Sequence, residues 1–141
     1  MRCVGVFFAG PGGLGKTGFK KRWFVLKNRV LYYLVEPPAL GRKPQLIGLI
    51  PIEGVLCDDD EDELEEIKPP KGLTTECLFR IFSEQSHYDE SGNWITVQVK
   101  SCKLDDEGNL KTGMHNDFVF AAEDEAAKAE WIAALRECKG F

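Results

Sequence analysis

A basic cluster within a predicted β-hairpin is the feature that most constrains this chain. Residues 20–34 read Lys-Lys-Arg-Trp-Phe-Val-Leu-Lys-Asn-Arg-Val-Leu-Tyr-Tyr-Leu. Two runs rich in Val, Phe and Tyr flank a polar break at 27–29, which predicts two paired strands joined by a tight turn. Side chains alternate along a strand, so Lys20 and Arg22 share one face while Lys21 lies on the other. Two cations on one face at the entrance to a sheet favour an anionic ligand with several phosphates.

Length and cysteine content predict one intracellular domain. The chain has 141 residues, and we expect a single domain over 1–141 that is a fragment of a larger protein. Its five cysteines are scattered and odd in number, which favours a reduced, cytoplasmic protein over a disulfide scaffold or a zinc site. No apolar run approaches the roughly 20 residues of a membrane span, so any membrane association is expected to be peripheral. We expect no cofactor and no metal.

The formal net charge of −5 hides an asymmetry along the chain. Residues 1–57 hold nine Lys/Arg and two acids, a charge of +7, whereas residues 58–141 hold nine Lys/Arg and 21 acids, a charge of −12. Nucleic-acid binding proteins need a wide basic footprint. A compact basic spot on an acidic body argues against a nucleic-acid partner and leaves a small anionic ligand as the better expectation.

The pattern along the chain is strand after strand, followed by one helix. Strands are expected at 4–8, in the 20–34 hairpin, and at 46–56, 77–82, 94–102 and 118–121, with turns near 91–93 and 105–109. Residues 10–18 and 36–45 are expected to be loops, and Pro51 reduces part of the 46–56 strand to an edge or a bulge. The fold class is therefore mainly β.

The last segment changes its period and predicts a helix over 123–138. Ala127, Trp131 and Leu135 recur at four-residue spacing and give the helix one apolar face. Asp124 is suited to cap the N-terminus, and acids crowd the first turn. We expect Trp131 to be buried against the sheet as a core residue without a chemical role.

Two other stretches carry motifs with weaker claims. The acidic run 58–66 predicts a solvated surface loop, because it lacks the ligand spacing and turn glycine of an EF-hand calcium loop. Residues 10–17 read Gly-Pro-Gly-Gly-Leu-Gly-Lys-Thr and match the phosphate-loop pattern of nucleotide-binding proteins. That mechanism needs a helix starting at Lys16 and Thr17, whereas the sequence continues into a strand pattern. We therefore expect the glycines to let Lys16 approach an anion, and an enzyme that hydrolyses nucleotide is the third-ranked function.

Several strands, a basic first hairpin and a C-terminal helix with an apolar-face Trp resemble the pleckstrin-homology (PH) domain. The resemblance rests on 20–26, 31–33 and 130–132, and it covers nearly the whole chain. Within that family the chain looks most like the PH domains of cytohesins, the Sec7-type exchange factors for Arf GTPases. Residues 48–53 resemble their fourth-strand segment, and 99–115 resemble their extra hairpin near the sixth strand. The resemblance implies a seven-stranded β-barrel or sandwich capped by one C-terminal helix.

The resemblance also implies a binding site at the open end of the barrel for an inositol phosphate headgroup, typically that of phosphatidylinositol 3,4,5-trisphosphate. The implied phosphoinositide-binding residues are Lys16, Thr17, Lys20, Arg22, Tyr33, Lys103 and His115. Three positions depart from the family pattern. Ala9, Ile47 and Met114 stand where the family has a lysine, an arginine and an asparagine, and losing these ligands lowers the expected affinity.

The sequence therefore predicts a non-catalytic, monomeric module that recruits a larger protein to a membrane containing phosphoinositide. The preferred phosphoinositide stays open. The alternative function is a protein-interaction PH module with weak or no lipid binding, for example for a small GTPase, in which the acidic face of residues 58–66 contributes to the interface.

Overall fold

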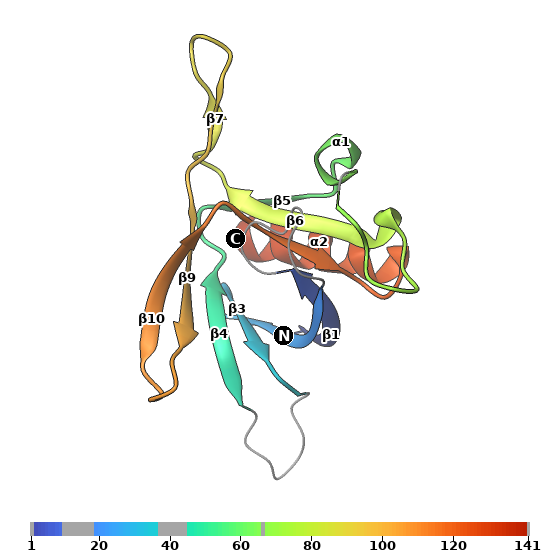
Figure 1. The fold of residues 1–141 in the computed structure, drawn as a ribbon, viewed down its shortest axis with the longest axis vertical. Coiled ribbons are helices and arrows are strands. Elements are labelled where there is room, and N and C mark those ends of the chain that lie inside the picture. The colour runs from blue at the N-terminus through green and yellow to red at the C-terminus, as the bar shows by residue number, and fades with distance from the viewer. Residues whose placement is uncertain (1, 10–18, 37–44, 66, 141) are drawn as a thin grey trace.

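One long antiparallel sheet forms most of the molecule (Figure 1). The structure is a computed structural model, and it describes residues 2–9, 19–36, 45–65 and 67–140. In space the strands follow the order β10-β9-β4-β3-β2-β1-β11-β6-β5. They are β1 (Arg2–Ala9), β2 (Lys20–Lys27), β3 (Val30–Leu34), β4 (Leu46–Pro51), β5 (Val55–Asp58), β6 (Leu78–Ser83), β9 (Val99–Leu104), β10 (Leu110–His115) and β11 (Asp117–Ala121). The expected mainly-β fold class is confirmed.

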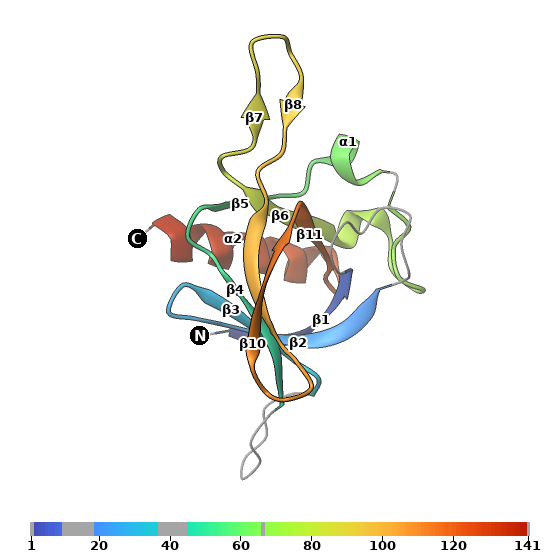
Figure 2. The same cartoon turned by 60° about the vertical axis from the view of Figure 1, so that its left-hand side comes forward.

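The core lies inside the curled sheet and is closed by helix α2 (Glu125–Gly140). Phe24 stacks on Tyr33 at 5.5 Å between ring centroids and meets Phe120 edge to face at 5.3 Å. Trp131 of α2 joins this cluster and is only 2% exposed. The helix runs alongside β5 and β6 (Figures 1 and 2). The predicted core role of Trp131 is therefore confirmed.

The start of α2 is fixed by a side-chain cap. The carboxylate of Asp124 accepts a hydrogen bond from the backbone amide of Ala127 at 2.7 Å, which satisfies one of the free donors at a helix N-terminus. The predicted cap is confirmed, although the helix spans 125–140 and is displaced two residues from the predicted 123–138.

The β2–β3 hairpin is closed by a two-residue turn at Asn28 and Arg29. Lys27 pairs with Val30, and the two turn residues have φ values of 54° and 61°. Positive φ at both central positions defines a type I′ turn, whose twist matches that of the flanking strands. Asn tolerates this region well, whereas Arg accepts it at some cost. The predicted hairpin is confirmed.

The predicted strand over 46–56 is two strands, so its extent was wrong. β4 ends at Pro51, and a turn closed by a hydrogen bond from the Val55 amide to the Ile52 carbonyl leads into β5. Gly54 sits in this turn with φ of +80°, a conformation that suits glycine. The chain therefore crosses from the β3 side of the sheet to its far edge beside β6.

Two hairpins close through the same five-residue loop. Residues 89–93 read Asp-Glu-Ser-Gly-Asn and residues 105–109 read Asp-Asp-Glu-Gly-Asn. In each loop the first Asp carboxylate accepts hydrogen bonds of 2.9 Å from the amides two and four residues later. Glycine occupies the fourth position with a φ of 84° or 83°, as this loop geometry requires. Both predicted turns are confirmed.

The first of these loops belongs to a separate two-stranded sheet. β7 (His87–Tyr88) pairs with β8 (Trp94–Ile95), and the hairpin projects from the end of the molecule (Figure 2). The predicted strand at 94–102 is therefore broken into β8 and β9. The Ser86 hydroxyl holds the break, because it accepts from the Val97 amide at 2.9 Å and donates to the Val97 carbonyl at 3.2 Å.

The described part of the acidic run 58–66 is mostly solvent-exposed, as predicted, but it is a helical turn anchored to the outside of the sheet and not a plain loop. It folds into the one-turn helix α1 (Glu61–Leu64), and the short 3-10 helix η1 (Thr75–Cys77) follows before β6. Leu64 is 2% exposed and Ile67 5% exposed. Both contact a second apolar cluster with Leu78 on the outer face, so two apolar residues anchor an otherwise charged segment.

Candidate functional site

The predicted site begins at the entrance to β2. Lys20 is exposed and Arg22 is half-buried, and both lie on the strand face that carries the buried Phe24. Lys21 lies on the outer face, with its ammonium 5.7 Å from the centre of the Trp23 ring. The alternation predicted from sequence is therefore present, and it directs Lys20 and Arg22 toward the inside of the curled sheet.

Strand register extends this inner face across four more strands. Phe24 pairs with Tyr33, Tyr33 with Gly48, and Gly48 with Lys103. Lys103 pairs in turn with Lys111 of β10. Directly opposed residues of antiparallel strands project from the same face of a sheet. One row of side chains therefore runs from the aromatic core to two lysines, and the predicted extra hairpin β9–β10 extends the sheet from β4.

Gly48 leaves the space into which Tyr33 extends. A Cβ atom at Gly48 would lie 2.5 Å from the Tyr33 hydroxyl and 2.6 Å from the carbonyl oxygen of Cys102. The phenol thus crosses over the β4 backbone in the direction of β9. Burial raises the pKa of Tyr33 above its usual value of 10.0, and the nearby charge of Arg22 offsets part of that rise. The hydroxyl stays protonated at neutral pH and retains its proton for donation.

His115 and Lys103 lie on the same inner face of the β9–β10 hairpin, where His115 pairs with Val99 and Lys103 pairs with Lys111. The His115 ring packs edge to face on Phe118 with 5.1 Å between centroids. A Cβ atom at Gly113 would lie 3.0 Å from Nε2 of His115 and 3.4 Å from Oγ of the buried Ser101, so the imidazole lies over Gly113. Burial and then the charge of Lys103 lower the pKa of His115 below 6.5. The ring is therefore neutral at pH 7.

Most cations at this end of the sheet have no carboxylate partner among the described residues. Within residues 19–36, 45–65 and 67–140, no carboxylate forms an ion pair with Lys20, Arg22 or Lys103. Arg22 donates from Nη1 to the carbonyl of its neighbour Lys21 at 2.9 Å. We call the set of side chains gathered here the basic mouth: Lys20, Arg22, Tyr33, Lys103, Lys111 and His115.

Lys111 is the member that the sequence analysis missed. It lies opposite Lys103, its side chain is 72% exposed, and its Nζ is 3.8 Å from Oδ2 of Asp105. The five-residue loop after Leu104 fixes this pairing, so the signal was present in the spacing around Gly108. Assigning Lys111 to the inner face needed the pairing of β9 with β4, which the sequence does not reveal.

Of the three positions that depart from the family pattern, the structure describes the side chain of Ile47 alone. Tyr33 pairs with Gly48 but Leu34 pairs with Leu46, so Ile47 is an extra residue in a β-bulge. Its half-buried side chain packs against the core cluster, and it can supply no ligand where the resemblance implies an arginine. The side chains of Ala9 and Met114 lie outside the described structure.

The described chain that follows the glycine-rich motif is a strand. Lys16 and Thr17 lie outside the described residues. The next described residues are Phe19 and then Lys20, where β2 begins. A phosphate loop needs a helix immediately after its Lys-Thr pair, since the helix amides hold the phosphates. β2 begins at Lys20, only three residues after Thr17, so the chain has no room for that helix. This argues against nucleotide binding.

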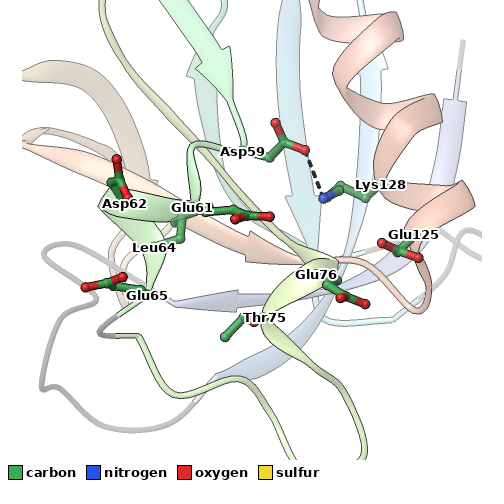
Figure 3. A pocket seen from close by; sticks show the side chains of 9 residues that line it. All are labelled: Asp59, Glu61, Asp62, Leu64, Glu65, Thr75, Glu76, Glu125 and Lys128. Carbon is green, nitrogen blue, oxygen red and sulfur yellow. Dashed lines mark ion pairs between the residues drawn. The ribbon is translucent and has the colours of Figure 1, made fainter.

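An acidic pocket lies between α1, η1 and the start of α2 (Figure 3). Its cavity measures about 400 Å³ and is lined by Asp59, Glu61, Asp62, Leu64, Glu65, Thr75, Glu76, Glu125 and Lys128. Lys128 is paired with Asp59 at 2.9 Å, and its hydrogen bond lowers the pKa of that carboxyl. The pocket thus repels anions, and no cluster of metal-ligating side chains is found in the described part of the chain.

Membrane crossing by a helix finds no support in the part of the chain that is described. Neither α1 nor α2 combines the length and the apolar character that a helical span requires.

Comparison with known proteins identifies relatives for nearly the whole chain. The family model of the PH domain matches residues 9–140. The chain is 29% identical to mouse cytohesin-4 over 89% of its length and 28% identical to bovine cytohesin-2, also over 89%. It is 29% identical to the ankyrin repeat, PH and SEC7 domain containing protein secG of Dictyostelium discoideum. The chain spans only 26%, 25% and 10% of these three proteins.

Solved structures share the fold at low sequence identity. The PH domain of ORP8 superposes with a TM-score of 0.58 at 16% identity, covering 99% of this chain and 96% of that one. The PH domain of the human KIAA0053 protein gives a TM-score of 0.55 at 17% identity and covers 100% of this chain and 89% of that one. These matches support the fold of the curled sheet and its closing helix.

Proposed function

This chain belongs to the PH domain family, a family of non-catalytic modules, and we propose that it binds the headgroup of a phosphoinositide in the basic mouth. Binding there would recruit the protein that contains the domain to a membrane surface. The curated relatives are several times longer than this chain, so the recruited activity would reside in other parts of such a protein.

The observation that carries the proposal is the shared row from Tyr33 across Gly48 to Lys103. It places a phenol hydroxyl and an ammonium group on one inner face, with Arg22 close enough to influence the pKa of Tyr33. Lys103 likewise influences the pKa of His115. These four groups therefore share the inner face of the sheet, and each can donate a hydrogen bond to a phosphate oxygen.

Each residue has a distinct part in this proposal. Arg22 offers a planar guanidinium that can donate to two phosphate oxygens at once. Its Nη1 becomes available for this role when its hydrogen bond to the Lys21 carbonyl breaks. Lys103 and Lys20 add point charges. The neutral His115 donates one ring hydrogen and gains a charge if the bound phosphates raise its pKa. Each charge-assisted contact contributes about 1.5–3 kcal/mol.

The lost arginine at Ile47 sets an upper limit on affinity. Ile47 is packed against the core, so β4 itself, Leu46–Pro51, brings no cation to the mouth. Lys111 adds one on the β10 side. We expect a shift of the headgroup toward β9–β10 and a weaker site than one with the full set of ligands, because Lys111 is mostly exposed and is already paired with Asp105.

Vesicle sedimentation tests the proposal. Parent protein, Arg22→Ala, Arg22→Lys and Lys21→Ala are each mixed with neutral vesicles, with phosphatidylserine vesicles, and with vesicles carrying one phosphoinositide at a time. We expect Arg22→Ala to lose roughly tenfold or more of phosphoinositide binding. Arg22→Lys should retain part of it, and Lys21→Ala on the outer face should lose least. Equal losses from Lys21 and Arg22 would indicate a nonspecific basic patch.

The second candidate function is a protein-interaction module, for example for a small GTPase. The acidic pocket favours it, since that surface presents six carboxylates and one paired lysine to a basic partner. The similarity to cytohesins and to a protein named GTP exchange factor for ARFs 1 from Caenorhabditis elegans adds context. Failure of the parent protein to bind any phosphoinositide vesicle would favour this function.

A further inference from the structure

A second surface groove lies along the free edge of β5, beside α2. Its cavity measures about 270 Å³ and is lined mainly by apolar side chains, among them Ile52, Val55, Leu56, Phe82 and Leu135, and by the two charged residues Asp58 and Arg136. Side chains from both faces of β5 line it, because Val55 points into the core and Leu56 points outward. The groove therefore follows the backbone edge of the strand.

The β5 edge presents backbone groups that no described strand pairs with. β5 is the last strand of the described sheet, and its only strand neighbour there is β6. The carbonyl of Cys57 points away from β6, because it accepts a hydrogen bond from Nη2 of Arg136 at 2.9 Å. In an antiparallel strand the N–H and C=O of one residue point to the same side. The amide of Cys57 is thus directed along the groove as well.

The exposed fractions fit an interaction surface. Leu56 is 42% exposed although it lies directly opposite the half-buried Phe82 on the outer face. Two acids near the groove are already engaged: Asp58 pairs with Arg80 at 2.9 Å, and Asp59 pairs with Lys128 at 2.9 Å. Within the described residues Arg136 donates to the Cys57 carbonyl and forms no ion pair, so its charge is available to an incoming carboxylate.

We propose that the β5 edge and α2 form a docking groove for an extended segment of a partner protein, which adds a strand beside β5. Such a segment would hydrogen-bond to the Val55 carbonyl and to the amide and carbonyl of Cys57, since the Val55 amide already donates to Ile52. It would place alternate apolar side chains against Leu56 and Leu135. It would displace Arg136 from the Cys57 carbonyl, and an acidic residue in the segment would pair with the released guanidinium. The groove is independent of the basic mouth.

A peptide-display selection on the folded domain tests this proposal. Random twelve-residue peptides are selected on the parent protein, and winners are measured on Arg136→Ala, Leu56→Lys and the mouth variant Arg22→Ala. We expect selected peptides to alternate apolar and polar residues around one Asp or Glu. Their affinity should fall roughly tenfold with Leu56→Lys, fall less with Arg136→Ala, and stay unchanged with Arg22→Ala.

Backbone pairing has its own control within the peptide. Replacing the residue next to the acidic one by proline removes an amide donor, and N-methylation at the same position does so without changing the side chain. Both changes should abolish binding. The proposal is overturned if no peptide is enriched over the Leu56→Lys domain, if winners depend on Arg22, or if light scattering shows that a second copy of the domain occupies the groove.

Discussion

The basic mouth and the acidic pocket show how one small domain separates two opposite charges. In the mouth, cations project from one row of strands, and Lys20, Arg22 and Lys103 have no carboxylate partner in the described structure. In the pocket, Lys128 is the one cation among the lining residues and forms an ion pair with Asp59, so carboxylates remain in excess. The net charge of −5 describes neither region. Ligand charge is therefore decided by which groups are left unpaired and not by the sum over the chain.

Trp131 packs in the core between the sheet and α2, and its removal should give the largest effect. The Trp131→Ala substitution deletes a large side chain from the core and should lower the free energy of unfolding by about 3–5 kcal/mol. Urea unfolding measures the loss, with Ala133→Ser on the exposed side of the same helix as the control. An unchanged midpoint for Trp131→Ala would show that the helix does not close the core.

Gly48→Ala should disturb the mouth while leaving the pocket intact. The added methyl would meet the Tyr33 ring and the Cys102 carbonyl at under 3 Å, and we expect a destabilisation of about 1–3 kcal/mol with a displaced Tyr33. Gly113→Ala is the matched control, because the nearest atoms to its Cβ belong to side chains, at 3.0 Å for Nε2 of His115 and 3.4 Å for Oγ of Ser101. The close approach would be contradicted if a crystal structure of Gly48→Ala showed Tyr33 in its original position. Unchanged Tyr33 resonances in its NMR spectrum would contradict it as well.

Lys103 and Lys100 lie on opposite faces of β9, so substituting each in turn tests which face binds the headgroup. Lys103→Ala should weaken headgroup binding roughly tenfold, since it removes a charge from the inner row. Lys111→Ala should cost about threefold, because that side chain is mostly exposed. Lys100→Ala on the outer face should change binding least. Calorimetric titration with a soluble inositol phosphate measures all three, and equal effects at Lys100 and Lys103 would refute a site on one face.

The pH dependence of binding isolates His115. Its pKa lies below 6.5 in the free protein, and bound phosphates should raise it, so headgroup affinity should increase as pH falls through this range. His115→Gln should remove this increment, whereas the exposed His87→Gln should not. Because the free-state pKa is depressed, His115 should also reduce folding stability as pH drops below 6.5.

Sequence reasoning located the elements better than their pairing. The 20–34 hairpin, the cap at Asp124 and the buried Trp131 were predicted, because local alternation, spacing and turn chemistry determine them. The break between β8 and β9 was missed, since no glycine or proline marks it and a single Ser86 hydroxyl holds it. The anchoring of the acidic run by Leu64 was missed because one apolar residue among acids gives no periodic signal.

In the candidate site, too, features set by one strand were predictable from sequence, and features set by the pairing of distant strands were not. The face of Arg22 follows from alternation along one strand, so sequence alone places it. Lys111 and the bulge at Ile47 depend on how β9 and β4 align, and such long-range register has no local signature. Lys16 and Thr17 stay predictions, because they lie outside the described residues.

Amide chemical-shift mapping during titration with a soluble inositol polyphosphate is the most direct test of the basic mouth as the ligand site. We predict the largest shifts at Arg22, Gly48, Lys103, Lys111 and His115, with little change around the acidic pocket at 59–65 and at Glu125. Absence of any saturable shift, or shifts that centre on the acidic pocket or on the β5 edge, would contradict the proposed function.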